Sequence, residues 1–178
     1  KTDFLLQNKL ENRPIIALLA GSRKQEISLI LPEMLKMLKH FPEFQFVIAV
    51  APSFSTQFYQ PFIENLPVKL VINQTYDLLK NADFAIVTSG TATLETALFN
   101  IPQIVVYKMQ QLQYDVGKFF IRVKYFSLVN IIMNSEVVKE LLQNKLEQLM
   151  KLELDKLIHN TDYRNKMLKN YETLKLKL

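Results

Sequence analysis

The sequence predicts an α/β fold built on a parallel sheet that helices cover on both faces. Between residues 14 and 106, short runs of β-branched and aromatic residues alternate with stretches of helical period. The runs are almost continuously apolar, as strands buried on both faces are. Strands that alternate with helices form parallel βαβ units. These observations predict a Rossmann-like, doubly wound parallel sheet.

Each element has its own signal in the sequence. The apolar runs predict strands at Ile15–Leu19, Phe44–Val50, Val68–Ile72, Phe84–Val87 and Ile104–Tyr107. Helical spacing of apolar residues predicts helices at Ile27–Leu38, Phe54–Ile63, Tyr76–Asn81 and Thr91–Phe99. Pro32 is expected to kink the first helix or to mark its restart. Beyond Tyr107 we expect a helix at 110–126, a short strand or loop at 127–133, and two or more helices at 136–178.

Composition excludes several classes of site. The chain of 178 residues has no cysteine, two histidines and three glycines, which are too far apart for a G-x-G-x-x-G motif or a P-loop. Disulfides, thiolate metal sites and a two-histidine helical metal site are therefore excluded, and we expect no metal and no cofactor. The net charge of +5 is spread along the chain, which argues against nucleic acid as a partner. We find no apolar run long enough for a membrane span.

The first candidate site is the turn after the first predicted strand. Gly21 would let the backbone approach an anion, Ser22 could cap the following helix or donate a hydrogen bond, and Arg23 offers a planar fork for phosphate oxygens. Ligands of open α/β sheets bind beyond the carboxyl ends of the strands, where this turn lies. An ordinary turn with a solvated Arg23 remains the alternative.

The second candidate site is the turn Thr88–Glu95, which again joins a strand to a helix. Ser89, Gly90, Thr91 and Ala92 supply hydroxyl and N–H groups with little bulk, as a bound diphosphate requires. Glu95 lies too far along the helix for a capping box. A carboxylate there could accept hydrogen bonds from both hydroxyls of a ribose. The alternative is an acid that only complements the helix dipole.

The third region runs from Tyr107 to Asn130 and is basic, with Lys108, Lys118, Arg122 and Lys124 against Asp115. It fits a core-facing helix with a solvated basic face, or a basic aromatic surface that meets phosphate or anionic lipid headgroups. Asn130 is polar among apolar neighbours and fits a turn or a ligand contact. His40 is expected at a helix C-terminus, and no Ser-His-Asp arrangement is apparent.

Several motifs together resemble one family. They are LLAGSRKQEI at 18–27, TSGTATLE at 88–95, VVYKM at 105–109, SLVNII at 127–132 and VKELLQ at 138–143. In order and spacing they resemble the C-terminal half of bacterial lipid-A-disaccharide synthase over residues 14–145. Ala20 and Val129 stand where the family commonly has proline.

The resemblance implies one half of a GT-B-type glycosyltransferase, without a metal. The family transfers 2,3-diacylglucosamine from UDP to 2,3-diacylglucosamine 1-phosphate with inversion, forming the β-1,6 lipid A disaccharide and UDP. The general base belongs to the other half, so this chain is expected to be inactive alone. The resemblance implies a connecting segment at 1–13, a nucleotide-sugar-binding domain at 14–145, and helices at 146–178 that pack here or reach the N-terminal half.

Site residues follow from the same resemblance. It implies that Arg23 and Asn130 support catalysis, with Arg23 offsetting charge on the departing UDP. The residues implied to bind the UDP-sugar are Gly21, Ser22, Arg23, Ser89, Gly90, Thr91, Ala92, Glu95, Tyr107 and Asn130.

The implied partners are the UDP-diacylglucosamine donor, the acylated acceptor through the missing half, and that half itself. The expected location is the cytoplasm, peripheral to the bacterial inner membrane, and its anionic surface is an open further partner. Another UDP-sugar glycosyltransferase or epimerase of this fold, or a non-catalytic UDP-sugar-binding module, is the alternative function.

Overall fold

A computed structural model describes residues 2–88, 90–108, 124–142 and 144–178. Its strands are β1 (Ile15–Leu19), β2 (Gln45–Val50), β3 (Val68–Ile72), β4 (Phe84–Thr88), β5 (Gln103–Tyr107) and β6 (Lys139–Leu142). Its helices are α1 (Thr2–Gln7), α2 (Lys24–Leu35), the 3₁₀ helix η1 (Lys36–Lys39), α3 (Thr56–Ile63), α4 (Thr75–Asn81), α5 (Thr91–Leu98), α7 (Leu128–Met133), α8 (Leu146–His159) and α9 (Thr161–Lys175).

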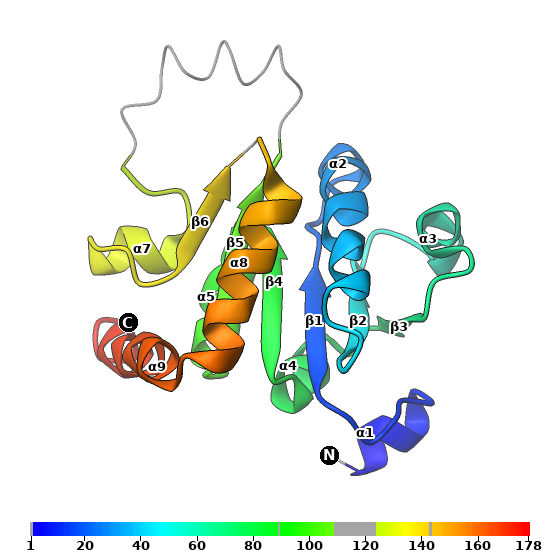
Figure 1. The fold of residues 1–178 in the computed structure, drawn as a ribbon, viewed down its shortest axis with the longest axis horizontal. Coiled ribbons are helices and arrows are strands. Elements are labelled where there is room, and N and C mark those ends of the chain that lie inside the picture. The colour runs from blue at the N-terminus through cyan, green and yellow to red at the C-terminus, as the bar shows by residue number, and fades with distance from the viewer. Residues whose placement is uncertain (1, 89, 109–123, 143) are drawn as a thin grey trace.

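The six strands form one parallel sheet in the order β3-β2-β1-β4-β5-β6. Helices cover both faces, and α2 and α8 lie in front of the sheet in Figure 1. Alternate residues of a strand point to opposite faces. Accordingly, Ile16 and Leu18 of β1 join a core cluster with residues of α2 and α8, whereas Ala17 and Leu19 join a second cluster with α1 and α4. The predicted doubly wound sheet is confirmed.

Two predictions beyond Tyr107 are wrong. Residues 128–133 form α7 rather than a strand or loop, because the Ser127 hydroxyl accepts the N–H of Asn130 and caps a helix. Residues 139–142 form β6 rather than a helix, because they pair in parallel with β5 at the edge of the sheet. Residues 110–123 of the predicted helix lie outside the described residues, and 124–126 are not helical.

Asn130 holds the segment that leads from α7 into β6. Its side-chain oxygen accepts the N–H groups of Val137 (2.8 Å) and Val138 (3.0 Å). Its amide nitrogen donates to the carbonyl of Val138 (2.8 Å) and to the carboxylate of Glu140 (2.9 Å). That carboxylate also accepts the N–H and hydroxyl of Ser127, both at 2.8 Å. Asn130 is completely buried, so this network fixes α7 against β6.

The C-terminal helices are attached to the domain by packing and by an ion-pair cluster. α9 buries Met167, Tyr171 and Leu174 and packs against α8, α5 and α7. At the start of α8, Glu147 accepts hydrogen bonds from Lys39 (2.7 Å) and His40 (3.0 Å), which end η1. The expected position of His40 at a helix C-terminus is confirmed. Within the described ranges, no helix is long and apolar enough to cross a membrane.

The Glu147 cluster predicts an acid-dependent stability. The hydrogen bonds from Lys39 and then His40 lower the pKa of Glu147 from 4.5 to about 2. A carboxyl group with a lowered pKa contributes stability above its unfolded pKa and loses it as the pH falls through the folded pKa. Glu147→Gln should therefore lower the melting temperature at pH 6. The difference in melting temperature between this variant and wild type should shrink as the pH falls from about 4.5 towards 2.

Thermal unfolding followed by circular dichroism checks this result. Glu43→Gln, which removes an exposed carboxylate elsewhere, is the matched control and should follow the wild-type curve. A difference between Glu147→Gln and wild type that stays constant down to pH 2.5 would contradict the assigned ion pairs.

The buried Asn130 network predicts a large loss of stability on truncation. Asn130→Ala leaves two N–H groups and a carbonyl without their partner, so the free energy of unfolding should fall by about 2–4 kcal/mol. Urea denaturation measures this change. Asn165→Ala, on the exposed side of α9, should change it by less than about 0.5 kcal/mol. If Asn130→Ala unfolds at the same urea concentration as wild type, the hydrogen-bond network around Asn130 does not form.

Candidate functional site

The two predicted turns meet at the point where the order of the strands reverses. β1 and β4 are neighbours, with Leu19 paired in register with Val87, but the chain goes on from β1 towards β2 and from β4 towards β5. The helices that follow, α2 and α5, therefore start beside each other and then diverge. Such a switch point at the carboxyl ends of the strands is where open α/β sheets bind ligands.

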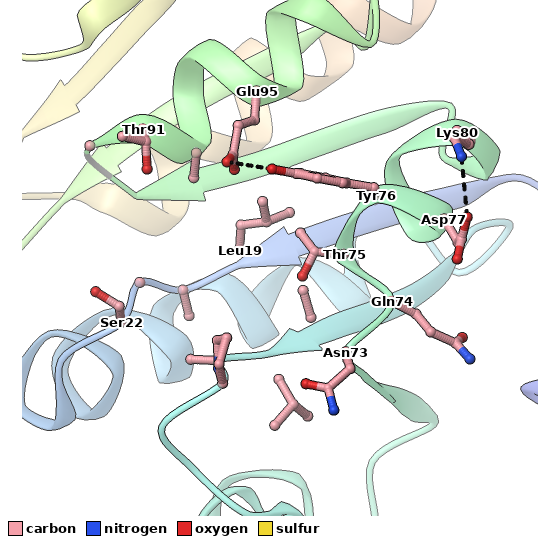
Figure 2. A pocket seen from close by; sticks show the side chains of 18 residues that line it. Leu19, Ser22, Asn73, Gln74, Thr75, Tyr76, Asp77, Lys80, Thr91 and Glu95 are labelled. Carbon is pink, nitrogen blue, oxygen red and sulfur yellow. Dashed lines mark hydrogen bonds and ion pairs between the residues drawn. The ribbon is translucent and has the colours of Figure 1, made fainter.

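A cavity of about 770 Å³ opens at this switch point. Figure 2 shows its side chains coming from the ends of β1 and β2, the β3–α4 loop and the start of α5. Six of the predicted site residues line it, namely Gly21, Ser22, Gly90, Thr91, Ala92 and Glu95. A volume of this size is typical of small-molecule sites. Two turns far apart in the sequence thus build one site.

Both turns depend on glycine in a left-handed conformation. Gly21 has φ +100° and Gly90 has φ +96°, values that side chains disfavour. At Gly21 an added Cβ would lie 2.1 Å from Oε2 of Glu26, so the Glu26 side chain would have to move to accommodate it. At Gly90, by contrast, the space in front of the backbone is open. A ligand can therefore approach the Gly90 backbone directly.

The start of α2 differs from its predicted cap. Arg23 is the N-cap residue and its side chain makes no capping bond, so Ser22 does not cap the helix. Instead the backbone N–H of Ser22 donates to Oε2 of Glu26 at 3.3 Å. Glu26 lies in the first turn of α2, where a negative charge is favoured by the helix dipole.

Glu95 lies on the second turn of α5 and faces α4. Its Oε1 accepts a hydrogen bond of 3.0 Å from the hydroxyl of Tyr76, as Figure 2 shows. This hydrogen bond raises the pKa of the Tyr76 phenol above its ordinary value. The tyrosine ring packs on Phe99, with ring centroids 5.5 Å apart. Glu95 is thus held at the wall of the cavity by a neighbouring helix.

Three predicted site residues lie outside the lining of the cavity, and Ser89 lies outside the described residues. Arg23 is exposed at the start of α2. Tyr107 ends β5, where burial raises the pKa of its phenol and its ring lies 5.5 Å from that of Phe126. Asn130 is buried in the network between α7 and β6. The structure therefore brings the two glycine turns together but not these side chains.

The described part of the predicted basic region is partly neutralised. Lys108, just after β5, pairs with Glu33 of α2 at 2.6 Å, and Lys36 pairs with the same carboxylate at 2.7 Å. Burial raises the pKa of Glu33, but the hydrogen bonds from Lys108 and Lys36 outweigh it and keep the pKa below its ordinary value. Lys118, Arg122 and Gly117 lie outside the described residues.

The site also includes residues that the sequence did not single out. Ala49–Pro52 span the end of β2 and the start of the loop after it. Asn73 and Gln74 join β3 to α4, and Thr75–Asp77 and Lys80 belong to α4 itself. None of these segments contains a glycine, the signal that identified the other two turns. Their place after a strand of a parallel sheet was the remaining signal. Within the described part of the chain, no three His, Cys, Asp or Glu side chains gather into a metal site.

The family model for lipid-A-disaccharide synthetase matches residues 1–177. The lipid-A-disaccharide synthase of Sulfurihydrogenibium sp. (strain YO3AOP1) is 34% identical, over 87% of this chain and 46% of the relative. That of Syntrophus aciditrophicus (strain SB) is 40% identical, over 75% of this chain and 37% of the relative. The chain thus spans less than half the length of these relatives.

Solved structures share the fold at low sequence identity. The spinosyn rhamnosyltransferase SpnG has a TM-score of 0.60 and 13% identity, over 91% of this chain and 41% of that one. The S. aureus MnaA-UDP co-structure has a TM-score of 0.57 and 13% identity, over 96% of this chain and 43% of that one. These matches confirm the Rossmann-like half of a GT-B-type fold. Because the family model accounts for nearly the whole chain, the protein belongs to the lipid-A-disaccharide synthetase family.

Proposed function

We propose that this chain is the donor-binding half of an inverting glycosyltransferase that makes the lipid A disaccharide. The observation that carries the proposal is the cavity at the switch point, where the Gly21 and Gly90 turns meet and Glu95 forms one wall. Membership of the family supports the same reading. The donor is UDP-2,3-diacylglucosamine, the acceptor is 2,3-diacylglucosamine 1-phosphate, and the products are the β-1,6 disaccharide and UDP.

In this proposal the donor diphosphate lies between the starts of α2 and α5. The first N–H groups of a helix have no partner within it and carry partial positive charge, so two such ends favour a diphosphate. Gly21 and Ser89–Ala92 contribute backbone N–H groups there, and Ser22, whose N–H is bonded to Glu26, contributes its hydroxyl. The exposed guanidinium of Arg23 offsets negative charge on the departing UDP.

The nucleoside extends from the diphosphate along the same cavity. Glu95 accepts the ribose hydroxyls, and the space continues to the β3–α4 loop, where the base lies between polar loop residues and the small apolar side chains that follow β2. Tyr107 and Asn130 lie beyond this lining. We therefore assign Asn130 to holding α7 against β6 through its buried network.

Transfer needs a second half. The acceptor 6-hydroxyl attacks C1 of the donor sugar, the bond from C1 to the diphosphate breaks, and UDP leaves with the electron pair. The hydroxyl proton passes to a general base that we place in the N-terminal half of the longer enzyme. Because both substrates carry acyl chains, we place the enzyme in the bacterial cytoplasm at the inner membrane, where the anionic surface is a further partner.

The proposed function predicts an effect of removing the ribose contact. Glu95→Ala removes a carboxylate that accepts charge-assisted hydrogen bonds, so the dissociation constant for UDP should rise about tenfold or more. Isothermal titration calorimetry with UDP measures this change. Glu64→Ala removes an exposed carboxylate outside the cavity and should bind UDP like wild type. Equal UDP binding by wild type and Glu95→Ala would contradict the site.

The proposed function also predicts which form of the protein carries out the reaction. The 178-residue chain should bind UDP and form no disaccharide. A longer protein that includes the N-terminal half should form it from the acylated UDP-glucosamine and the acylated glucosamine phosphate, as followed by mass spectrometry of the lipid product. Activity of that longer protein on unacylated UDP-glucosamine alone would reject the assigned substrates.

A further inference from the structure

Tyr76 contacts the one carboxylate assigned to the ribose, and it does so from a different element. The Tyr76 hydroxyl at the start of α4 donates to Oε1 of Glu95 at 3.0 Å, which joins the wall formed by α4 to the wall formed by α5. Within the described part of the chain, the Glu95 side chain makes no other hydrogen bond. The orientation of this carboxylate therefore depends on Tyr76.

The environment of Tyr76 suits a positioning role. Tyr76 is 54% exposed and lines the cavity, yet its ring packs on Phe99, the C-cap residue of α5, with an angle of 38° between the rings. The ring is thus supported by the same helix that carries Glu95, and the hydroxyl has a fixed place from which to donate. Burial alone does not account for a tyrosine here, because a fully apolar side chain would pack on Phe99 as well.

We infer that Tyr76 is a positioning residue for ribose recognition: its hydroxyl holds the Glu95 carboxylate in the orientation that accepts both ribose hydroxyls of the donor. The inference rests on the proposed function, since it takes Glu95 as the ribose contact. It goes further in naming a residue that makes the site discriminate ribose from 2′-deoxyribose. A hydroxyl-specific site loses affinity for an analogue that lacks the hydroxyl, because its own polar group is left unpaired.

The test compares UDP with 2′-deoxy-UDP by calorimetry on the 178-residue chain. Tyr76→Phe keeps the ring on Phe99 and removes only the hydroxyl. The dissociation constant for UDP should rise about three- to tenfold, as expected for loss of one hydrogen bond. The constant for 2′-deoxy-UDP should rise less, so the preference for UDP should fall. In a Glu95→Ala background, which has no acceptor for the Tyr76 hydroxyl, Tyr76→Phe should have no further effect.

A second tyrosine–carboxylate pair provides the matched control. The hydroxyl of Tyr163 donates to Glu153 in the C-terminal helices, away from this cavity. Tyr163→Phe should therefore leave both dissociation constants and their ratio unchanged. A merely structural effect of losing a tyrosine hydroxyl would change the binding of both nucleotides equally and leave the ratio as it is.

The outcomes separate the two proposals. If wild type binds UDP but Tyr76→Phe keeps the wild-type constant and ratio, or binds UDP more tightly, the positioning role is overturned while the proposed function stands. If wild type shows no saturable UDP binding, the proposed function fails, and the role of Tyr76 fails with it.

Discussion

The reversal of strand order between β1 and β4 is the constraint on which the rest of this structure depends. All six strands run in the same direction, so their carboxyl ends share one edge of the sheet. Only where the order reverses do the helices that follow two neighbouring strands, here α2 after β1 and α5 after β4, lead away from each other. The space that this leaves cannot be filled by a connecting loop, and it becomes the cavity. The donor site is therefore a consequence of topology, and the side chains determine what it binds.

Backbone conformation then makes the cavity accessible. The described residues with a left-handed conformation outside the two glycine turns are four asparagines and two lysines. They follow helices or strands, except for Lys145, which is the N-cap residue of α8. Gly21 and Gly90 differ because both line the cavity, Gly21 in the turn before α2 and Gly90 at the N-cap of α5. A side chain at Gly21 would collide with Glu26, whereas one at Gly90 would project into open space. A chain so poor in glycine thus places two of its three glycines where a ligand meets the backbone.

The sequence predicts those elements of the fold that have a local signal, such as a continuous apolar run or a glycine after it. Buried strands are continuous apolar runs, and each glycine turn follows one of them, so β1, β4 and both turns could be found without a structure. β6 could not, because an edge strand within a segment rich in leucine and lysine is defined by its pairing with β5. The role of Asn130 depends on Glu140, ten residues away, and that of Tyr76 on Glu95, nineteen residues away. Contacts of this kind are set by how helices and strands pack against each other. The spacing of apolar residues in the sequence does not predict that packing.

The central claim is that one ligand binds across both glycine turns, and nuclear magnetic resonance tests it most directly. In ¹H–¹⁵N spectra of the chain titrated with UDP, the amide signals of Gly21, Ser22 and Gly90 to Ala92 should shift together and saturate at one concentration. The amide of Val137, which donates to Asn130 outside the cavity, should shift little. Shifts confined to one turn, or centred on α8 and α9, would contradict the account.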